Sequence, residues 1–290
     1  MIRVGVAGWD YPDWNGIVYP PRSPSGFDRL AYLARYVNLI EVNSSFYRPV
    51  TPRVAESWVR RTERYPDFAF AAKAHRSCTH DPAAEPLEAA ARTLQGLKPL
   101  RDAGRLEALL LQFPQSFHFD ARAVERLERL LPAFEGWPLV VEVRHISWES
   151  ETAGDWFASK AVGWCAVDQP QVGRSTARVL PRVTSALAYL RLHGRNTADW
   201  FRPDAGRDAR YDYRYDAGQL QELASTARDM ARTANSLVVV QNNHFRGKAV
   251  ANALQMKSLL GGGRPLAPEG LLAVYPDLEP VVRVERTRLF

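Results

Sequence analysis

The feature that most constrains the fold is a regular alternation along the chain of short apolar runs with segments of helical periodicity. Each apolar run leads into a polar loop and then into apolar residues spaced three or four positions apart, as on one face of a helix. Strands that alternate with helices in this way are joined by right-handed crossovers into a parallel sheet. We expect eight strands, at residues 2–7, 39–43, 68–73, 108–112, 139–143, 163–167, 187–193 and 237–241.

Two observations favour a closed barrel over an open, doubly wound sheet. The runs 109–111 and 237–240 are continuously apolar, as expected of parallel strands buried on both faces. No strand is followed by the glycine-rich turn with which many doubly wound sheets hold a phosphate. The sequence therefore predicts an α/β fold, a (β/α)₈ TIM barrel with a parallel closed sheet, built as a single domain from residues 1–290.

Charge and composition limit the class of protein. Hydrophobic residues make up 46% of the chain and charged residues 24%, which is typical of a globular protein. The net charge of +6 favours anionic partners, namely phosphorylated metabolites, nucleotides or nucleic acid. Arginines that alternate with glutamates, as in residues 125–129, are equally typical of a solvated helix face. We therefore expect at most weak, salt-sensitive binding of nucleic acid.

Two cysteines, Cys78 and Cys165, are too few for a disulfide framework and fit a reducing compartment. The amino terminus runs directly into a strand pattern without the features of a signal peptide. No apolar run approaches the length of a membrane span. We expect a cytoplasmic protein without membrane association. Cys165 is expected to be inert core, whereas Cys78 could be a reactive thiol, although nothing else marks it as a nucleophile.

Polar residues concentrate where the expected strands end, which is the face that carries the active site in (β/α)₈ barrels. Strand side chains alternate between two faces, so residues flanked by apolar neighbours share one face. If the apolar set packs on the helices, the polar set points into the barrel. That set comprises Glu41, Asn43, Lys73, His75, Glu142, Arg144, Arg191 and His193. A structural ion-pair layer is the alternative, but burying so many charges at the functional end favours a site.

Several short motifs form a distinctive combination that spans essentially the whole chain. They are Gly8-Trp9 with Tyr11, Trp14, Gly16 and Tyr19-Pro20; Glu41 to Tyr47; Lys73 with Thr79-His80; Gln112-Phe113-Pro114; Glu142 to His145 with Ser147-Trp148; Asp168; Arg191 to Gly194; and Asn243, Gly247, Ala249, Asn252 and Ala253. In these motifs the chain resembles the YecE-like family, also called domain of unknown function family 72. The resemblance implies a (β/α)₈ fold and brings no established reaction. The chain departs from the family pattern at Cys78 and Ala7, so neither residue is expected to be essential.

The polar set suggests an anion subsite with acid–base chemistry beside it. Arg144, Arg191 and Lys73 could clamp a phosphate or carboxylate. An acid and a base could come from Glu142 with His193, or from Glu41 with Lys73. The expected catalytic residues are Glu41, Lys73, Glu142, Asp168 and His193. Three amides suit substrate hydroxyls: Asn43, Gln112 and Asn243.

The expected entrance to the barrel is rich in aromatic side chains, which could stack on bases or sugars or could simply pack the loops. A long irregular stretch, Gly194 to Tyr215, would follow the seventh strand, and loops of that length are usually functional. The aromatic residues are Trp9, Tyr11, Trp14, Tyr47, Trp148, Trp200 and Phe201. Of these, we expect Trp9, Tyr11, Tyr47 and Trp148 to bind substrate.

No cofactor is predicted. A divalent metal is the less favoured alternative, because no paired histidines stand at ligand spacing. Its candidate ligands would be Glu41, Glu142, His145, Asp168, His193 and His244, with His75, Cys78 and His80 as softer ones.

The leading hypothesis is an enzyme that uses acid–base chemistry on a small anionic substrate, phosphorylated, sugar-like or nucleotide-like, by hydrolysis or lysis of a phosphoester or glycosidic bond. The alternatives are a nucleic-acid-binding or processing protein and a non-catalytic binder of a small anion. A closed pocket would favour a metabolite, and an open basic groove would favour a polymer.

Overall fold

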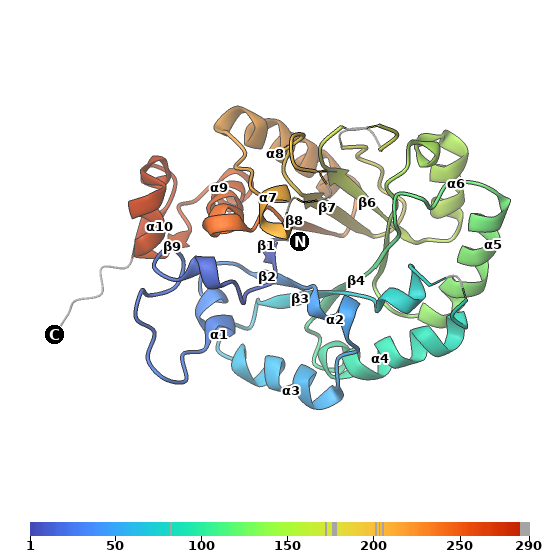
Figure 1. Cartoon of the computed structure of the whole chain (residues 1–290), viewed down its shortest axis with the longest axis horizontal. Coiled ribbons are helices and arrows are strands. Elements are labelled where there is room, and N and C mark those ends of the chain that lie inside the picture. Colours follow the sequence, from blue (N-terminus) through green and yellow to red (C-terminus); the bar gives the residue numbers. More distant parts are fainter. Residues whose placement is uncertain are drawn as a thin grey trace.

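The computed structural model describes residues 1–81, 83–171, 173–175, 179–200, 202, 204 and 206–284. Eight strands form a closed parallel barrel in chain order, with β8 paired to β1 (Figure 1). The fold class predicted from the sequence is therefore confirmed. The strands are β1 (Ile2–Ala7), β2 (Leu39–Val42), β3 (Ala69–Lys73), β4 (Leu106–Gln112), β5 (Leu139–Glu142), β6 (Gly163–Asp168), β7 (Leu187–Leu192) and β8 (Ser236–Gln241).

Helices cover the outside of the barrel, with α3 and α4 along the lower edge of the view and α8 and α9 along the upper and left sides (Figure 1). The helices are α1 (Arg29–Leu33), α2 (Ser44–Tyr47), α3 (Pro52–Arg61), α4 (Pro86–Asp102), α5 (Ala121–Leu130), α6 (Glu151–Ser159), α7 (Arg207–Arg210), α8 (Ala217–Thr233), α9 (Lys248–Gly261) and α10 (Glu269–Val274). Short 3₁₀ helices lie at Pro12–Trp14, Arg76–Cys78, Leu131–Phe134, Ile146–Glu149, Phe245–Gly247 and Pro276–Leu278. A small parallel pair, β9 (Leu266–Ala267) and β10 (Arg283–Val284), stands outside the barrel.

The helix starts follow from local sequence. The Asp216 side chain accepts from the Gln219 backbone N–H and Gln219 bonds back, which completes a capping box at α8. At α5 the Asp120 side chain caps the helix by accepting a hydrogen bond from the Ala123 backbone N–H.

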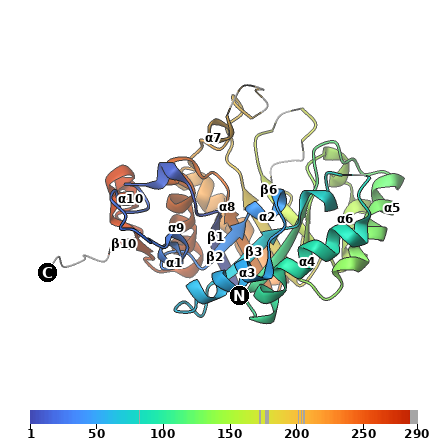
Figure 2. The same ribbon diagram turned by 60° about the horizontal axis from the view of Figure 1, so that its bottom comes forward.

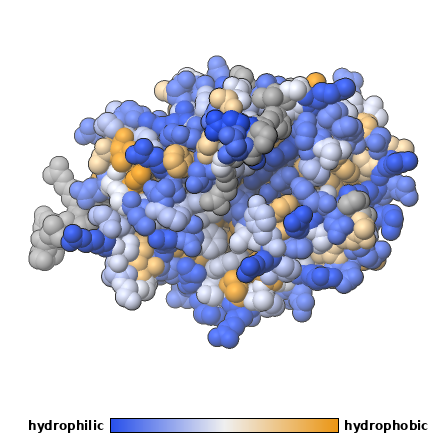
Figure 3. Space-filling view, viewed as in Figure 1, coloured by the Kyte–Doolittle hydropathy of each residue, from blue (hydrophilic) through white to orange (hydrophobic). Residues whose placement is uncertain are grey.

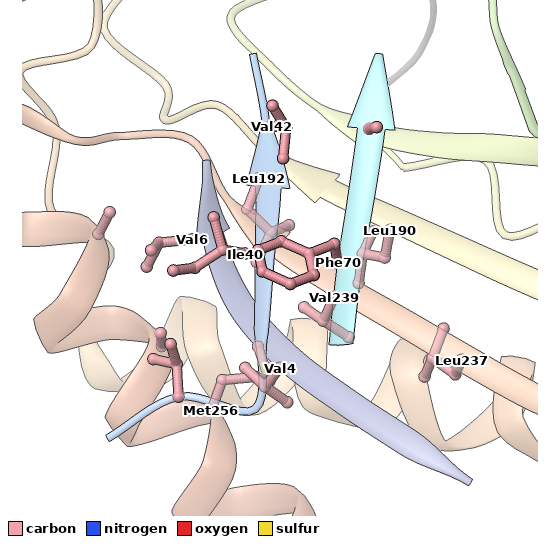
Figure 4. Close-up of a cluster of buried hydrophobic side chains, with 14 of the residues drawn as sticks. Val4, Val6, Ile40, Val42, Phe70, Leu190, Leu192, Leu237, Val239 and Met256 are labelled. Carbon is pink, nitrogen blue, oxygen red and sulfur yellow. The ribbon is translucent and has the colours of Figure 1, made fainter. Parts of the chain in front are cut away.

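The period of two along the strands divides their side chains into two cores. One set fills the barrel interior and includes the buried Cys165, as expected: Ala7, Leu39, Ala71, Ala108, Leu110, Val140, Cys165, Val167, Tyr189, Val238 and Val240. The alternate residues face the helices. Figure 4 shows part of this outer core, in which Val4 and Val6 of β1 lie near Met256 of α9, with Ile40 of β2 and Phe70 of β3 also in view. Continuous apolar runs therefore serve both faces of each strand.

The strands agree with the expected ranges to within two residues, but three end earlier than expected. Asn43 takes helical backbone angles as the N-cap of α2, so β2 stops at Val42. Residues 143 and 193 likewise follow the ends of β5 and β7. The alternation of side chains between two faces therefore does not determine where side chains beyond these strand ends point.

The carboxyl ends of the strands lie opposite the amino terminus. In Figure 2 the amino terminus is at the bottom, while α7 and the connection that leaves β6 rise at the top. No helix in the described part of the chain is both long and apolar enough to cross a membrane.

Gly5 is expected to be essential for closing the barrel, because a Cβ there would lie 1.8 Å from the Leu39 carbonyl oxygen of β2. Gly5→Ala should therefore destabilise the fold by about 3 kcal/mol or more, since backbone and not a flexible side chain must move. Gly263→Ala is the control, because a Cβ at Gly263 meets nothing within 4 Å. Urea midpoints followed by circular dichroism would measure both, and equal midpoints for the two variants would contradict the close approach.

Candidate functional site

A cavity of about 490 Å³ opens at the carboxyl ends of the strands. Figure 3 shows this side of the molecule as mainly hydrophilic, with a hydrophilic hollow near its middle. The cavity is lined by Tyr11, Asn43, Phe46, Tyr47, Lys73, His80, Gln112, Arg144, Arg191, Arg210, Tyr211, Asn242 and His244. These residues come from the ends of strands or from the connections that follow them.

The floor of the cavity is a buried chain of ion pairs. Arg191 of β7 donates through Nη2 to Glu41 Oε1 of β2 at 2.7 Å and through Nη1 to Glu142 Oε2 of β5. The Tyr189 hydroxyl donates to the other Glu41 oxygen at 2.8 Å. Both carboxylates are fully buried, and Arg191 is 1% exposed. We call Glu41, Arg191 and Glu142 the ion-pair layer.

Glu142 also holds Arg144, whose Nε and Nη2 lie 2.7 and 2.6 Å from Glu142 Oε1. Burial alone would raise the pKa of the Glu142 carboxyl, but Arg191 and Arg144 hold it well below its usual range. The same carboxylates raise the pKa of Arg191 against the opposing effect of burial. Glu142 is therefore ionised at neutral pH and cannot donate a proton there.

Lys73, at the end of β3, has a different environment. Its Nζ donates to Gln112 Oε1 at 2.8 Å and lies 4.7 Å from the centre of the Phe46 ring. In the described part of the chain no carboxylate lies within ion-pair distance of this amine. Burial and then Arg191 lower the pKa of Lys73 to about 7, although Glu142 and Glu41 act in the opposite direction. The amine therefore exists in both protonation states near neutral pH.

His193 lies under the lining beside the ion-pair layer. Its Nδ1 is 2.8 Å from Asn242 Nδ2, and its Nε2 is 3.9 Å from Glu142 Oε1, with no hydrogen-bond partner in the described part of the chain. Burial first, and then Arg191, hold the pKa of this imidazole well below its usual range. The ring is therefore neutral, and with Asn242 as the donor its proton lies on Nε2, on the side of Glu142.

The mouth of the cavity is aromatic. Tyr11 stacks on His244 with ring centres 4.4 Å apart, and its hydroxyl donates to the Ala7 carbonyl. Tyr47 is 69% exposed at the rim, and Tyr211 approaches from the connection after β7. Trp200 lies edge-on to His193 at 5.9 Å, while Phe201 lies outside the described residues.

The structure brings most of the expected site residues to this place. Seven line the cavity: Tyr11, Asn43, Tyr47, Lys73, Gln112, Arg144 and Arg191. Glu41, Glu142 and His193 lie directly beneath them, fully buried. Glu41 and Glu142 thus form a buried ion-pair layer, which was the structural alternative to a catalytic role. They nevertheless lie at the carboxyl ends of the strands, directly under the cavity.

Asp168, expected among the catalytic residues, does not reach the cavity. It is the last residue of β6, and the inward positions of that strand are Cys165 and Val167, so Asp168 faces outward. There it accepts from Arg195 Nη2 and from the Tyr215 hydroxyl, both at 2.7 Å. These bonds anchor the connection after β7 to the barrel.

His75, which the alternation placed inside the barrel, also lies elsewhere. Because β3 ends at Lys73, His75 instead caps a 3₁₀ helix, where its Nδ1 lies 2.8 Å from the Ser77 hydroxyl.

Three further residues expected to bind substrate have structural surroundings instead. Trp148 is fully buried and donates from Nε1 to the Phe117 carbonyl at 2.7 Å. Trp9 packs edge-on against Trp58, outside the cavity lining. Asn243 donates to the Tyr213 carbonyl and to Asn252 Oδ1 at 2.8 and 2.9 Å. Trp14 is likewise buried in the core.

Sequence reasoning did not assign Phe46, His80, Arg210, Tyr211, Asn242 or His244 to the substrate site. Arg210 and Tyr211 belong to the long irregular stretch after β7, whose length was the available signal. Arg210 is the last residue of the short helix α7, Tyr211 follows it, and both side chains line the cavity. His80 follows β3, where Thr79-His80 was part of the family-like pattern. Burial and then Lys73 lower the pKa of His80 to about 4.

Among the described residues, no three side chains of histidine, cysteine, aspartate or glutamate converge to form a metal site. The expectation of a metal-free protein stays a prediction. Cys78 is buried, and burial raises the pKa of its thiol, which does not favour reactivity.

Removing Arg191 should strongly destabilise the protein, because Glu41 and Glu142 would lose their shared buried counterion. We expect Arg191→Met to cost about 3–5 kcal/mol in the free energy of unfolding. Arg129→Met, at an exposed position of α5, should change it by about 0.5 kcal/mol or less. Adding Glu41→Gln to Arg191→Met should recover part of the loss. Denaturant titrations would measure all three variants, and a small effect of Arg191→Met would show that the layer is not structural.

Comparison with known proteins places the chain. It is 30% identical over 273 residues to the UPF0759 protein YunF of Bacillus subtilis, a match that covers 90% of this chain and 95% of that protein. A crystal structure of a DUF72 family protein from Thermotoga maritima matches with a TM-score of 0.79 and 32% identity over 90% of this chain and 99% of that chain. One from Enterococcus faecalis matches with a TM-score of 0.79 and 26% identity over 90% and 96%.

The model of one family, described as "Protein of unknown function DUF72", matches residues 3–271. This is the family that the motifs of the sequence resemble. The match includes the barrel strands, except for the first residue of β1, and every residue that lines the cavity. The chain therefore belongs to the DUF72 family of proteins of unknown function.

Proposed function

We propose that this protein is an enzyme that uses acid–base chemistry on a small anionic substrate held in the cavity at the carboxyl ends of the strands. The reaction would be hydrolysis or lysis of a phosphoester or glycosidic bond. One observation carries the proposal. The lining contains four cationic side chains, Lys73, Arg144, Arg191 and Arg210, and no carboxylate among its described residues.

The cations differ in how far protein groups already neutralise them. Both terminal nitrogens of Arg191 are bound to the carboxylates of the ion-pair layer, and Arg144 shares Glu142. Arg210 donates from Nη2 to the Arg202 carbonyl at 3.3 Å, and its buried Nε has no hydrogen-bond partner among the described residues. Lys73 and Arg210 thus supply positive charge beyond that of the layer. An anion near them would restore neutrality at the mouth.

The acid–base role falls on Lys73. General acids and bases work best when their pKa lies near the working pH. The pKa of Lys73 is about 7, whereas Glu142 is ionised and His193 neutral at that pH. Gln112 accepts from the amine, Asn43 lines the same cavity, and both amides suit substrate hydroxyls. Glu41 and Glu142 would contribute indirectly, because they position the guanidinium groups of Arg191 and Arg144.

The size of the cavity favours a metabolite over a polymer. Its volume of about 490 Å³ falls within the range of about 300–1,000 Å³ that is typical of small-molecule sites. The aromatic rings of Tyr11, Tyr47 and Tyr211 at the mouth could stack on a sugar or a base of such a ligand.

An anion should stabilise the wild-type fold through Lys73. In thermal melts with phosphate, sulfate and nucleoside monophosphates, we expect a gain of about 2.7 kcal/mol at a hundredfold excess over the dissociation constant. Lys73→Met should lose most of that gain because it removes the amine and keeps the apolar stem. Lys98→Met makes the same chemical change at an exposed position of α4 and should retain the gain. No gain for the wild type, or an equal gain for Lys73→Met, would refute the anion subsite.

The affinity for sulfate should fall as the pH rises from about 6 to about 8.5, because Lys73 loses its proton around pH 7 while sulfate keeps its charge. His80 and His193, whose pKa values are lowered, remain neutral throughout this range. Lys73→Arg should bind sulfate without this dependence, since a guanidinium stays protonated. Calorimetric titrations at both pH values would decide, and a wild-type affinity independent of pH would exclude Lys73 as the titrating group.

A further inference from the structure

We propose that Lys73 is a covalent catalytic residue, whose amine forms a Schiff base with an aldehyde or ketone group of a substrate that also carries a carboxylate or phosphate. This inference rests on the proposed function and narrows its substrate to anionic carbonyl compounds. It also favours lysis over hydrolysis, because an iminium ion accepts electrons from a neighbouring bond that breaks and hydrolysis needs no such acceptor.

Lys73 differs from the other lysines of the chain in its position. The chain has five lysines, and all of them lie in the described part. Three form ion pairs with carboxylates, Lys98 with Asp102, Lys160 with Glu128 and Lys248 with Asp212. The fourth, Lys257, donates to the Tyr36 carbonyl at 2.7 Å. Lys73 is the one that lines the central cavity.

The chemical environment of the Lys73 amine favours its neutral form. A lysine becomes a nucleophile when desolvation or a neighbouring cation favours its neutral form. Lys73 has both conditions, with the Phe46 ring on one side and Arg144 and Arg191 at the floor and wall of the cavity. Its pKa of about 7 follows from burial and from Arg191. Gln112 Oε1 accepts one N–H of the Lys73 amine, and the Lys73 side chain still lines the cavity.

Two arginines in the cavity lining suit the anionic group of such a substrate. Arg144 and Arg210 line the same cavity as Lys73 and supply guanidinium groups, which carry a permanent positive charge in proteins. Guanidinium groups can hold the anionic group of a substrate, while the amine meets its carbonyl carbon. The carboxylate or phosphate of the substrate therefore orients its carbonyl group. An aldehyde without such an anionic group should react slowly with Lys73.

The covalent step balances with the amine, the substrate and one proton from solvent. The neutral Lys73 nitrogen attacks the carbonyl carbon, and the electrons of the C=O double bond move to oxygen. A proton passes from nitrogen to that oxygen to give a carbinolamine. The hydroxyl then takes a second proton from solvent water and leaves as water, while the nitrogen lone pair forms the C=N bond of the protonated imine. No oxidant or reductant takes part.

Trapping with borohydride tests the proposal. The wild-type protein is incubated near pH 7.5 with glyoxylate, with glycolaldehyde phosphate or with acetaldehyde, and borohydride then reduces any imine to a stable amine. Peptide mass spectrometry assigns the adduct among the five lysines. We expect Lys73 to react with one or both anionic aldehydes on the order of a hundredfold faster than the exposed Lys98, because each unit of pKa changes the neutral fraction about tenfold. Excess sulfate should slow this reaction.

The controls separate the two proposals. Lys73→Arg should give no adduct at this position and should still be stabilised by sulfate. The wild-type assignment does not depend on whether that variant folds. If no lysine is selectively labelled while sulfate stabilises the wild type, the Schiff base is refuted and the anion site stands. If sulfate does not stabilise it either, both proposals fail. Equal labelling of Lys73 by acetaldehyde would refute the requirement for an anionic carbonyl compound.

Discussion

The buried ion pairs of Arg191 with Glu41 and Glu142 are the interaction on which the rest of the site depends. They join β7 to β2 and β5, strands that are far apart in the sequence and separated by others in the barrel. A buried charge is tolerated only while its partners remain, so the layer fixes the spacing of these strands at the level of the cavity floor. Tyr189, directly below in β7, completes the hydrogen bonds of Glu41 and begins the apolar interior.

The same layer determines which charges are left for a ligand. Glu41 and Glu142 lie below the cavity surface and neutralise Arg191 and Arg144 from beneath. Any ligand in the cavity therefore meets cations and amides but no carboxylate among the described residues. A carboxylate placed beside Lys73 would instead keep its amine protonated. The barrel thus keeps the carboxylates that bind the arginines away from the Lys73 amine, whose protonation state can change near neutral pH.

The sequence predicted the barrel and the inward residues well because both depend on the period of two within strands. Glu41, Lys73, Glu142 and Arg191 lie within β2, β3, β5 and β7, where that period holds. Asp168 also lies in a strand, but its position in the alternation is the outward one, which grouping by strand end overlooked. Beyond the strand ends the period is lost. Trp148 and Asn243 are placed by tertiary packing, and no local pattern distinguishes them from residues at the mouth.

Arginine and lysine contribute different chemistry to this cavity. A guanidinium stays protonated, so Arg144, Arg191 and Arg210 can bind or balance charge but cannot act as nucleophile or base. In a chain where five of 38 cationic side chains are lysines, the remaining cation of the lining is Lys73. A bound anion would raise the pKa of Lys73 again if it lay beside the amine. Neutral amine and bound anion are compatible only when the acid group lies on the arginines and a different part of the ligand faces the lysine.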